Sequence, residues 1–216
     1  DGAGGVIVVF STSSRIQAQR IDASGNRLWG SDGVALTPLG SSAYNPFAVP
    51  DGAGGVLIGW ADQRNFGSTG VDLYVQRVNS SGVAQWTANG VALCTATGDQ
   101  GNVRIAWDPA GALYAAWEDA RNLGVTGLDV YAQKLSAAGV PQWTAGGIPV
   151  CTSNGAQTHP VLAPAIGFTG YSIWVAWQDA RTDGGDIYAQ SFTSSGVPTQ
   201  VANGVTVHNV ATNTQS

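Results

Sequence analysis

The stretch Trp177–Gln190, WQDARTDGGDIYAQ, decides how the rest of the chain is organised. Related stretches begin at Trp60 (WADQRNFGSTGVDLYVQ) and at Trp117 (WEDARNLGVTGLDVYAQ). A shift of the sequence against itself by 57 residues aligns further glutamines and glycines in four copies: Gln19, Gln76, Gln133 and Gln190; Gly25, Gly82, Gly139 and Gly196; Gly33, Gly90, Gly147 and Gly204. Such a period predicts a repeat protein, in which a residue present in every copy is first a requirement of the repeated unit.

Each full copy reads as four short strands. In the third copy we expect strands at 102–107, 112–117, 129–135 and about 142–150, separated by turns. Strands such as VLIGW and IWVAW are apolar on both faces, which indicates sheets packed on both sides. Four-stranded units of this length stack as β-propeller blades, whereas a row of β-sandwiches needs about seven strands per unit. The expected fold is all-β, a propeller of four-stranded antiparallel blades.

The blades are expected at 1–43, 44–100, 101–157 and 158–216, within one repeat domain. The first copy departs from the pattern, because VVFSTSSRIQAQ replaces the Trp, Asp and Arg, and residues 1–5 match the turn at 51–55. The first blade is therefore expected to lack its first strand. A free strand edge invites pairing. We expect 4–10 and 204–210 to contact further blades of the same protein or neighbouring subunits, as in a segment of a larger propeller or assembly.

The composition excludes several classes of function. Net charge is −5, and Lys134 and Glu118 are the single Lys and Glu, so the clustered cations of a nucleic-acid surface are absent. No apolar run reaches the roughly 20 residues that span a bilayer, so no membrane insertion is expected. Scarce Lys with abundant Thr and Asn favours an extracellular or cell-surface location.

The elements W-x-D-x-R, D-[ILV]-Y-x-Q and G-x-x-x-W resemble the β-propeller repeats of large secreted and cell-surface proteins of bacteria and archaea. The resemblance covers nearly the whole chain. It implies a repeat architecture and says little about activity.

The repeated Trp, Asp and Arg are interpreted as a structural motif. The Asp at the end of the second strand can accept bonds from turn amides, and the Arg can pair with it or with the Asp that opens the third strand. The motif residues are Trp60, Asp62, Arg64, Asp72, Trp117, Asp119, Arg121, Asp129, Trp177, Asp179, Arg181 and Asp186. No cofactor is expected; calcium at Asp179, Asp183 and Asp186 is the alternative, although no full calcium-loop signature is present.

Two cysteines occupy one position of the repeat. Thr37, Cys94, Cys151 and His208 are equivalent. Equivalent positions of successive blades lie farther apart than a disulfide allows, so both cysteines are interpreted as small buried apolar residues. A disulfide, formed through distortion or with another chain, is the alternative.

No catalytic residue is expected. Glu118 stands at a variable position, where other copies have Ala61 and Gln178, and no nucleophile lies beside a base. The leading hypothesis is a non-catalytic scaffold or assembly module, not an enzyme. A carbohydrate-binding or adhesive module, using the loops after Trp60, Trp117 and Trp177, is the alternative, and a propeller-type glycoside hydrolase is the least favoured. Exposed aromatic rings could stack on sugars, and the candidates are Tyr44, Phe66 and Phe168.

Overall fold

The computed structural model describes residues 1–13, 15–167, 170–182 and 185–209, and this part of the chain consists of strands joined by turns and loops. None of the described residues belongs to a helix suited to crossing a membrane. The strands are β1 (Val6–Thr12), β2 (Arg15–Ile21), β3 (Val34–Ala35), β4 (Ala43–Pro50), β5 (Val56–Asp62), β6 (Asp72–Val78), β7 (Val91–Cys94), β8 (Gln100–Trp107), β9 (Leu113–Asp119), β10 (Asp129–Leu135), β11 (Ile148–Cys151), β12 (Gln157–Gly167), β13 (Gly170–Asp179), β14 (Asp186–Phe192) and β15 (Val205–His208).

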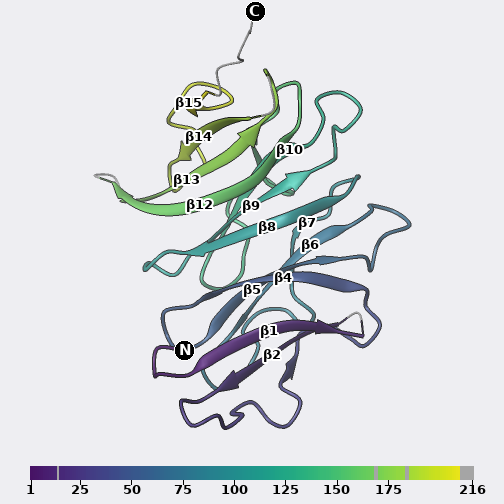
Figure 1. Ribbon diagram of the computed structural model, residues 1–216, viewed down its shortest axis with the longest axis vertical. Coiled ribbons are helices and arrows are strands. Elements are labelled where there is room, and N and C mark those ends of the chain that lie inside the picture. The colour runs from purple at the N-terminus through teal and green to yellow at the C-terminus, as the bar shows by residue number, and fades with distance from the viewer. Residues whose placement is uncertain (14, 168–169, 183–184, 210–216) are drawn as a thin grey trace, which may run out of the picture.

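The strands form four antiparallel sheets in chain order. One sheet has the order β1-β2-β3, and the other three have the orders β4-β5-β6-β7, β8-β9-β10-β11 and β12-β13-β14-β15. The sheets stack face against face, with the first sheet at one end of the molecule and the last at the other (Figure 1). The fold is all-β, and the sheets are β-propeller blades, as the repeat predicts. We call them the first to fourth blades.

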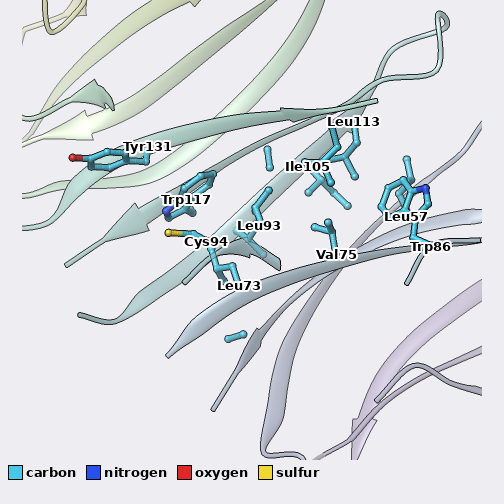
Figure 2. Packing of buried hydrophobic residues seen from close by; sticks show 14 of the residues in the cluster. Leu57, Leu73, Val75, Trp86, Leu93, Cys94, Ile105, Leu113, Trp117 and Tyr131 are labelled. Atoms are coloured by element: carbon cyan, nitrogen blue, oxygen red, sulfur yellow. The ribbon is translucent and has the colours of Figure 1, made fainter. Parts of the chain in front are cut away.

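Both faces of an internal blade are buried, as the doubly apolar strands predict. Every residue of β5 is buried. Val56, Ile58 and Trp60 join the core against the first blade, while Leu57 and Ala61 join the core against the third. Figure 2 shows this second core, where Leu57 and Val75 of the second blade approach Ile105 and Leu113 of the third. Because successive side chains of a strand point to opposite faces of the sheet, β5 contributes to the interfaces with both neighbouring blades.

The fourth strand of each blade is shorter than expected. In the third blade only Ile148–Cys151 is a strand, although 142–150 was predicted. An isolated bridge between Leu135 and Pro141 closes the preceding turn. Trp143 then leaves the sheet, and its Nε1 donates to the carbonyl oxygen of Ser194 in the fourth blade at 3.3 Å. The apolar Trp143 packs between blades and not within a strand.

The first strands of the second, third and fourth blades each contain a bulge at the same repeat position. The register shifts between Tyr44 and Phe47 in β4, and equivalent shifts occur in β8 and β12. The residues inside the bulges have left-handed backbone conformations: Asn45 (φ 49°), Asn102 (φ 49°) and His159 (φ 54°). A bulge interrupts pairing and redirects side chains. These bulges shape the cavity described next.

Candidate functional site

A cavity of about 640 Å³ opens between the second and third blades. The bulge of β4, the start of β8 and the end of β9 line it, together with Leu123 from the loop after β9. The polar and charged side chains that could bind or act on a ligand here are Tyr44, Asp99, Gln100, Asn102, Arg104 and Glu118.

Glu118 is the next-to-last residue of β9 and is only 9% exposed. Its Oε2 accepts a hydrogen bond from Asn102 Nδ2 at 2.7 Å, and its Oε1 accepts one from the backbone N–H of His159 at 2.8 Å. Asn102 and His159 are the bulge residues of the third and fourth blades. Two bulges therefore hold one carboxylate in a single orientation.

A second carboxylate comes from Asp99, directly before β8. Its Oδ1 accepts the backbone N–H of Val71 at 2.9 Å, which ties it to the second blade. Burial, followed by the negative charge of Asp99, raises the pKa of the Tyr44 hydroxyl. The cavity thus combines two acidic side chains from the β8–β9 hairpin with a phenol ring from β4 of the second blade.

Gln100 lines the same cavity and contains an unsatisfied acceptor. Its Nε2 donates to the carbonyl oxygens of Ala96 (3.0 Å) and Gly98 (2.6 Å). Its Oε1 is buried, and no described residue donates to it. A buried acceptor without a donor costs about 1 to 3 kcal/mol. Gln157, the equivalent residue of the fourth blade, has the same buried acceptor outside this cavity, so this feature belongs to the repeat and does not by itself indicate a ligand.

A cation–aromatic pair completes the lining. The Arg104 guanidinium carbon lies 4.9 Å from the centre of the Phe47 ring. Arg104 Nη1 also donates to the carbonyl oxygen of Val103 at 3.1 Å. Aromatic faces with nearby hydrogen-bond donors and acceptors suit a ligand that is both polar and ring-shaped.

The cavity lies where the copies of the repeat differ. Asp99 is equivalent to Ser42 and Ala156, and Glu118 to Ala61 and Gln178. Tyr44 and Arg104 also have different residues in the other copies. The sequence therefore contains a signal for this site, namely departure from the repeat. The departure at Glu118 was noted in the sequence but was interpreted as evidence against catalysis.

The predicted motif residues lie outside the cavity, since none of the twelve lines it. In each of the second, third and fourth blades the Arg pairs with the Asp two residues before it: the Nη2–Oδ2 distances are 2.6 Å for Arg64–Asp62, 2.6 Å for Arg121–Asp119 and 2.7 Å for Arg181–Asp179. The Trp of the motif donates its Nε1 to the same carboxylate, at 3.0, 2.8 and 2.8 Å.

The Asp that opens the third strand has a different partner. Asn65 donates to Asp72 Oδ2 at 2.8 Å, Asn122 to Asp129 Oδ2 at 2.9 Å, and Thr182 Oγ1 to Asp186 Oδ2 at 2.6 Å. Burial raises the pKa of Asp129 and outweighs the bonds from Asn122 and Thr126. The sequence left open whether the Arg pairs with the Asp two residues before it or with the Asp that opens the third strand. In the structure it forms its ion pair with the first of these.

The calcium candidates do not converge in the described residues. Asp179 directs both oxygens to Arg181 and Trp177, and Asp183 lies outside the described residues. Within 1–13, 15–167, 170–182 and 185–209, no three His, Cys, Asp or Glu side chains form a group that could hold a metal ion.

Cys94 and Cys151 are buried with free thiols. Each sulfur lies against the motif of the following blade, and Arg121 Nη2 is 3.2 Å from Cys94 Sγ. Burial raises the pKa of Cys94 to about 11, so its thiol is protonated at neutral pH. Of the aromatic candidates, Tyr44 lines the cavity, Phe66 is 58% exposed on its loop, and Phe168 lies outside the described residues.

Comparison with known proteins finds similarity in structure only. No model of a protein family matches the sequence, and no curated protein sequence matches it. The solved structures similar to it include an α-L-arabinanase of Penicillium chrysogenum (12% identity, TM-score 0.48) and an endo-1,4-β-xylanase of Bacteroides thetaiotaomicron (10%, 0.48). An α-L-arabinofuranosidase of Lactobacillus brevis is also similar (11%, 0.45). The matches cover 86%, 92% and 85% of this chain, and 56%, 71% and 64% of those chains, respectively.

These comparisons contradict two expectations. The chain was expected to be a non-catalytic scaffold and not an enzyme, whereas the proteins of similar structure are named as arabinanases, a xylanase and arabinofuranosidases. The expectation was wrong because it took the variable position of Glu118 as a reason against catalysis, whereas the cavity is lined by residues that differ between the copies. Identities of 10 to 12% concern the fold, so no residue role is transferred from those enzymes.

Proposed function

We propose that the cavity between the second and third blades binds a saccharide and that the chain acts on it as a glycoside hydrolase. The observation that carries the proposal is the presence of Asp99 and Glu118, two carboxyl groups at non-repeated positions, in one cavity with Tyr44. Sugar rings bind through aromatic faces and hydroxyl hydrogen bonds, and this lining offers both.

Most glycoside hydrolases use two carboxyl groups that flank the scissile bond. One carboxyl donates its proton to the glycosidic oxygen as the bond to the anomeric carbon breaks. The other takes a proton from a water molecule whose oxygen attacks that carbon, so each product sugar has a hydroxyl group. Glu118, held by Asn102 and the His159 amide, is the oriented member of the pair, and Asp99 is the exposed member.

Two substitutions test the proposal. A panel of chromogenic glycosides, including arabinosides and xylosides, is assayed with the wild type, Glu118→Gln and Asp99→Asn. Each substitution should lower kcat by at least about a hundredfold, as expected for loss of a general acid or base. Asp32→Asn, at an exposed position in the first blade, is the matched control and should leave the rate unchanged.

Binding is measured separately by calorimetry with the corresponding oligosaccharides. If an oligosaccharide binds, Tyr44→Ala weakens its binding and no substrate is turned over, the proposal of a saccharide site stands and the proposal of a hydrolase is wrong. No binding and no turnover would overturn both.

We also infer a secreted or cell-surface location. Many saccharide polymers are degraded outside the cell, and the scarcity of Lys is consistent with that environment. Fractionation of cells of the source organism, followed by detection with an antibody, tests the location; recovery only from the cytosol would contradict it.

A further inference from the structure

The two end blades each expose an apolar face. On β1, Ile7 and Val9 pack in the core toward the second blade, whereas Val6 and Val8 point the other way and are 50% and 41% exposed. We call this surface the β1 face. In the second blade, the residues equivalent to Val6 and Val8 are Val56 and Ile58, which are 4% and 0% exposed because the first blade covers them.

The fourth blade exposes the opposite side of the same repeat unit. Ile173 and Val175 of β13 pack toward the third blade, while Trp174 is 38% exposed and Val161, on the neighbouring β12, is 57% exposed. We call this surface the β13 face. The residues equivalent to Trp174 in the second and third blades are Leu57 and Tyr114, both 0% exposed because the following blade covers them.

The β1 face and the β13 face are therefore the two halves of one repeating interface. Within the chain, the side that contains Leu57 or Tyr114 always meets the side that contains residues equivalent to Val6 and Val8 in the next blade. Both free faces are apolar, and they lie at opposite ends of the molecule (Figure 1). A chain with two complementary faces at opposite ends can associate head to tail.

We propose that the β13 face of one copy binds the β1 face of a second copy. Trp174 of one copy then contacts Val6 and Val8 of the other, which reproduces the contact between consecutive blades. A head-to-tail contact of this kind produces a ring if the rotation closes and a filament if it does not.

One element of the internal interfaces is missing from the proposed one. Trp29, Trp86 and Trp143 each reach into the following blade, and their Nε1 atoms donate to the carbonyl oxygens of Ser80 (3.1 Å), Ala137 (3.0 Å) and Ser194 (3.3 Å). The equivalent residue of the fourth blade is Gln200. At the receiving position of the first blade, Gly25, an added Cβ would meet no atom within 4 Å. Contact between copies therefore lacks the tryptophan and should be weaker and reversible.

A mixing experiment tests the direction of this contact. Sedimentation velocity and light scattering should show that the wild type associates as its concentration rises. Val8→Asp and Trp174→Asp should each reduce the chain to monomers or, at most, open dimers of low affinity, because each removes one half of the interface. Each variant retains the half that the other has lost, so their mixture should form a one-to-one complex. Val125→Asp, at a loop position 83% exposed, is the control and should associate like the wild type.

A second variant tests the missing tryptophan. Gln200→Trp should lower the Kd of association by about tenfold, as for a tryptophan at the centre of an interface. Gly25→Ala in the same chain should cancel the gain, because the indole would have to rest on that glycine. Circular dichroism and melting curves confirm that each variant is folded. A wild type that stays monomeric at every concentration, or a mixture of the two Asp variants that forms no complex, would overturn the proposal.

Discussion

At the residue scale, the motif Asp is the common acceptor for the Trp and the Arg of its blade. Asp119 is fully buried and accepts hydrogen bonds from Trp117 Nε1 (2.8 Å), the Arg121 backbone N–H (2.9 Å), Arg121 Nε (2.8 Å) and Arg121 Nη2 (2.6 Å). The thiol of Cys94 also donates to its Oδ2, at 3.8 Å. Arg121 in turn donates to the carbonyl oxygen of Gly146 and lies 3.8 Å above the centre of the Tyr131 ring. One carboxylate thereby connects the second strand, the loop and the third strand.

Asp119→Ala should lower the free energy of unfolding by about 1 to 3 kcal/mol, because it removes the acceptor of the Trp117 indole N–H and of Arg121 Nε. Urea unfolding of the variant and the wild type measures the loss. Asp32→Ala, at an exposed position, serves as the control and should stay within about 0.5 kcal/mol of the wild type. Unchanged stability of Asp119→Ala would show that the network does not support the blade.

The same network predicts how stability depends on pH. Burial alone would raise the pKa of Asp62, but the hydrogen bonds from Arg64 and Trp60 outweigh it, so its pKa in the folded state is lowered. Asp179 behaves in the same way. Because the unfolded state then binds protons more readily, this stabilisation is present above the ordinary Asp pKa of about 3.9 and is lost as pH falls below it.

We therefore expect the free energy of unfolding to decrease as pH falls below about 4. Asp62→Asn should be less stable than the wild type at neutral pH, and the difference should shrink toward low pH. Denaturant unfolding over a pH series measures both curves. A constant difference at every pH would show that the charge of Asp62 contributes nothing.

At the element scale, consecutive blades are connected by a tryptophan that lies on a glycine. Trp86 leaves the turn after β6 and covers Gly139 of the third blade, whose backbone is left-handed (φ 76°). A Cβ at Gly139 would lie 2.6 Å from the indole ring. Gly82 and Gly196 receive Trp29 and Trp143 in the same way. These glycines are repeated because of the close approach as well as the backbone conformation.

Gly139→Ala and Gly25→Ala separate these two causes. Gly25 has the same left-handed conformation (φ 85°), but a Cβ there meets nothing within 4 Å. Gly25→Ala should therefore cost only the backbone strain of about 1 to 2 kcal/mol. Gly139→Ala should lower the free energy of unfolding by about 1 to 3 kcal/mol more than Gly25→Ala does, because it displaces Trp86. Equal losses in urea unfolding would mean that the contact with the indole is unimportant.

At the scale of the whole molecule, stability depends on contacts between neighbouring blades. Each of the two central blades has packed interfaces on both sides, whereas each end blade has one within the chain. In repeat proteins the stability of a unit is approximately its own contribution plus those of its neighbours. The central strands should therefore open least often.

Amide hydrogen exchange at low protein concentration should show the strongest protection in β5, β6, β9 and β10, and weaker protection in β1 and β12. The reason is that β5 and β9 are buried along their whole length, while β1 has an exposed face. Protection of β1 should rise with concentration if copies associate head to tail. Uniform protection across all four blades would indicate that they open together as one cooperative unit.

The repeat alone was sufficient to predict the blades, because the alternation of apolar residues and the glycine positions are local requirements of each copy. The third strand of the third blade begins and ends as predicted, at Asp129 and Leu135. The fourth strand does not, because whether Trp143 stays in its sheet or packs on the next blade depends on Gly196, which is more than fifty residues away.

By itself the sequence determined an all-β chain of stacked four-stranded units, since that information recurs in every copy. Only the tertiary structure decided which of the residues that differ between the copies line a common cavity. Asp99, directly before β8, and Glu118, near the end of β9, are brought close by the pairing of β8 with β9. They share a cavity with Tyr44 only because β4 of the second blade packs beside β8. A repeat pattern specifies the contacts that every unit makes, whereas a site depends on which non-repeated side chains those contacts bring together.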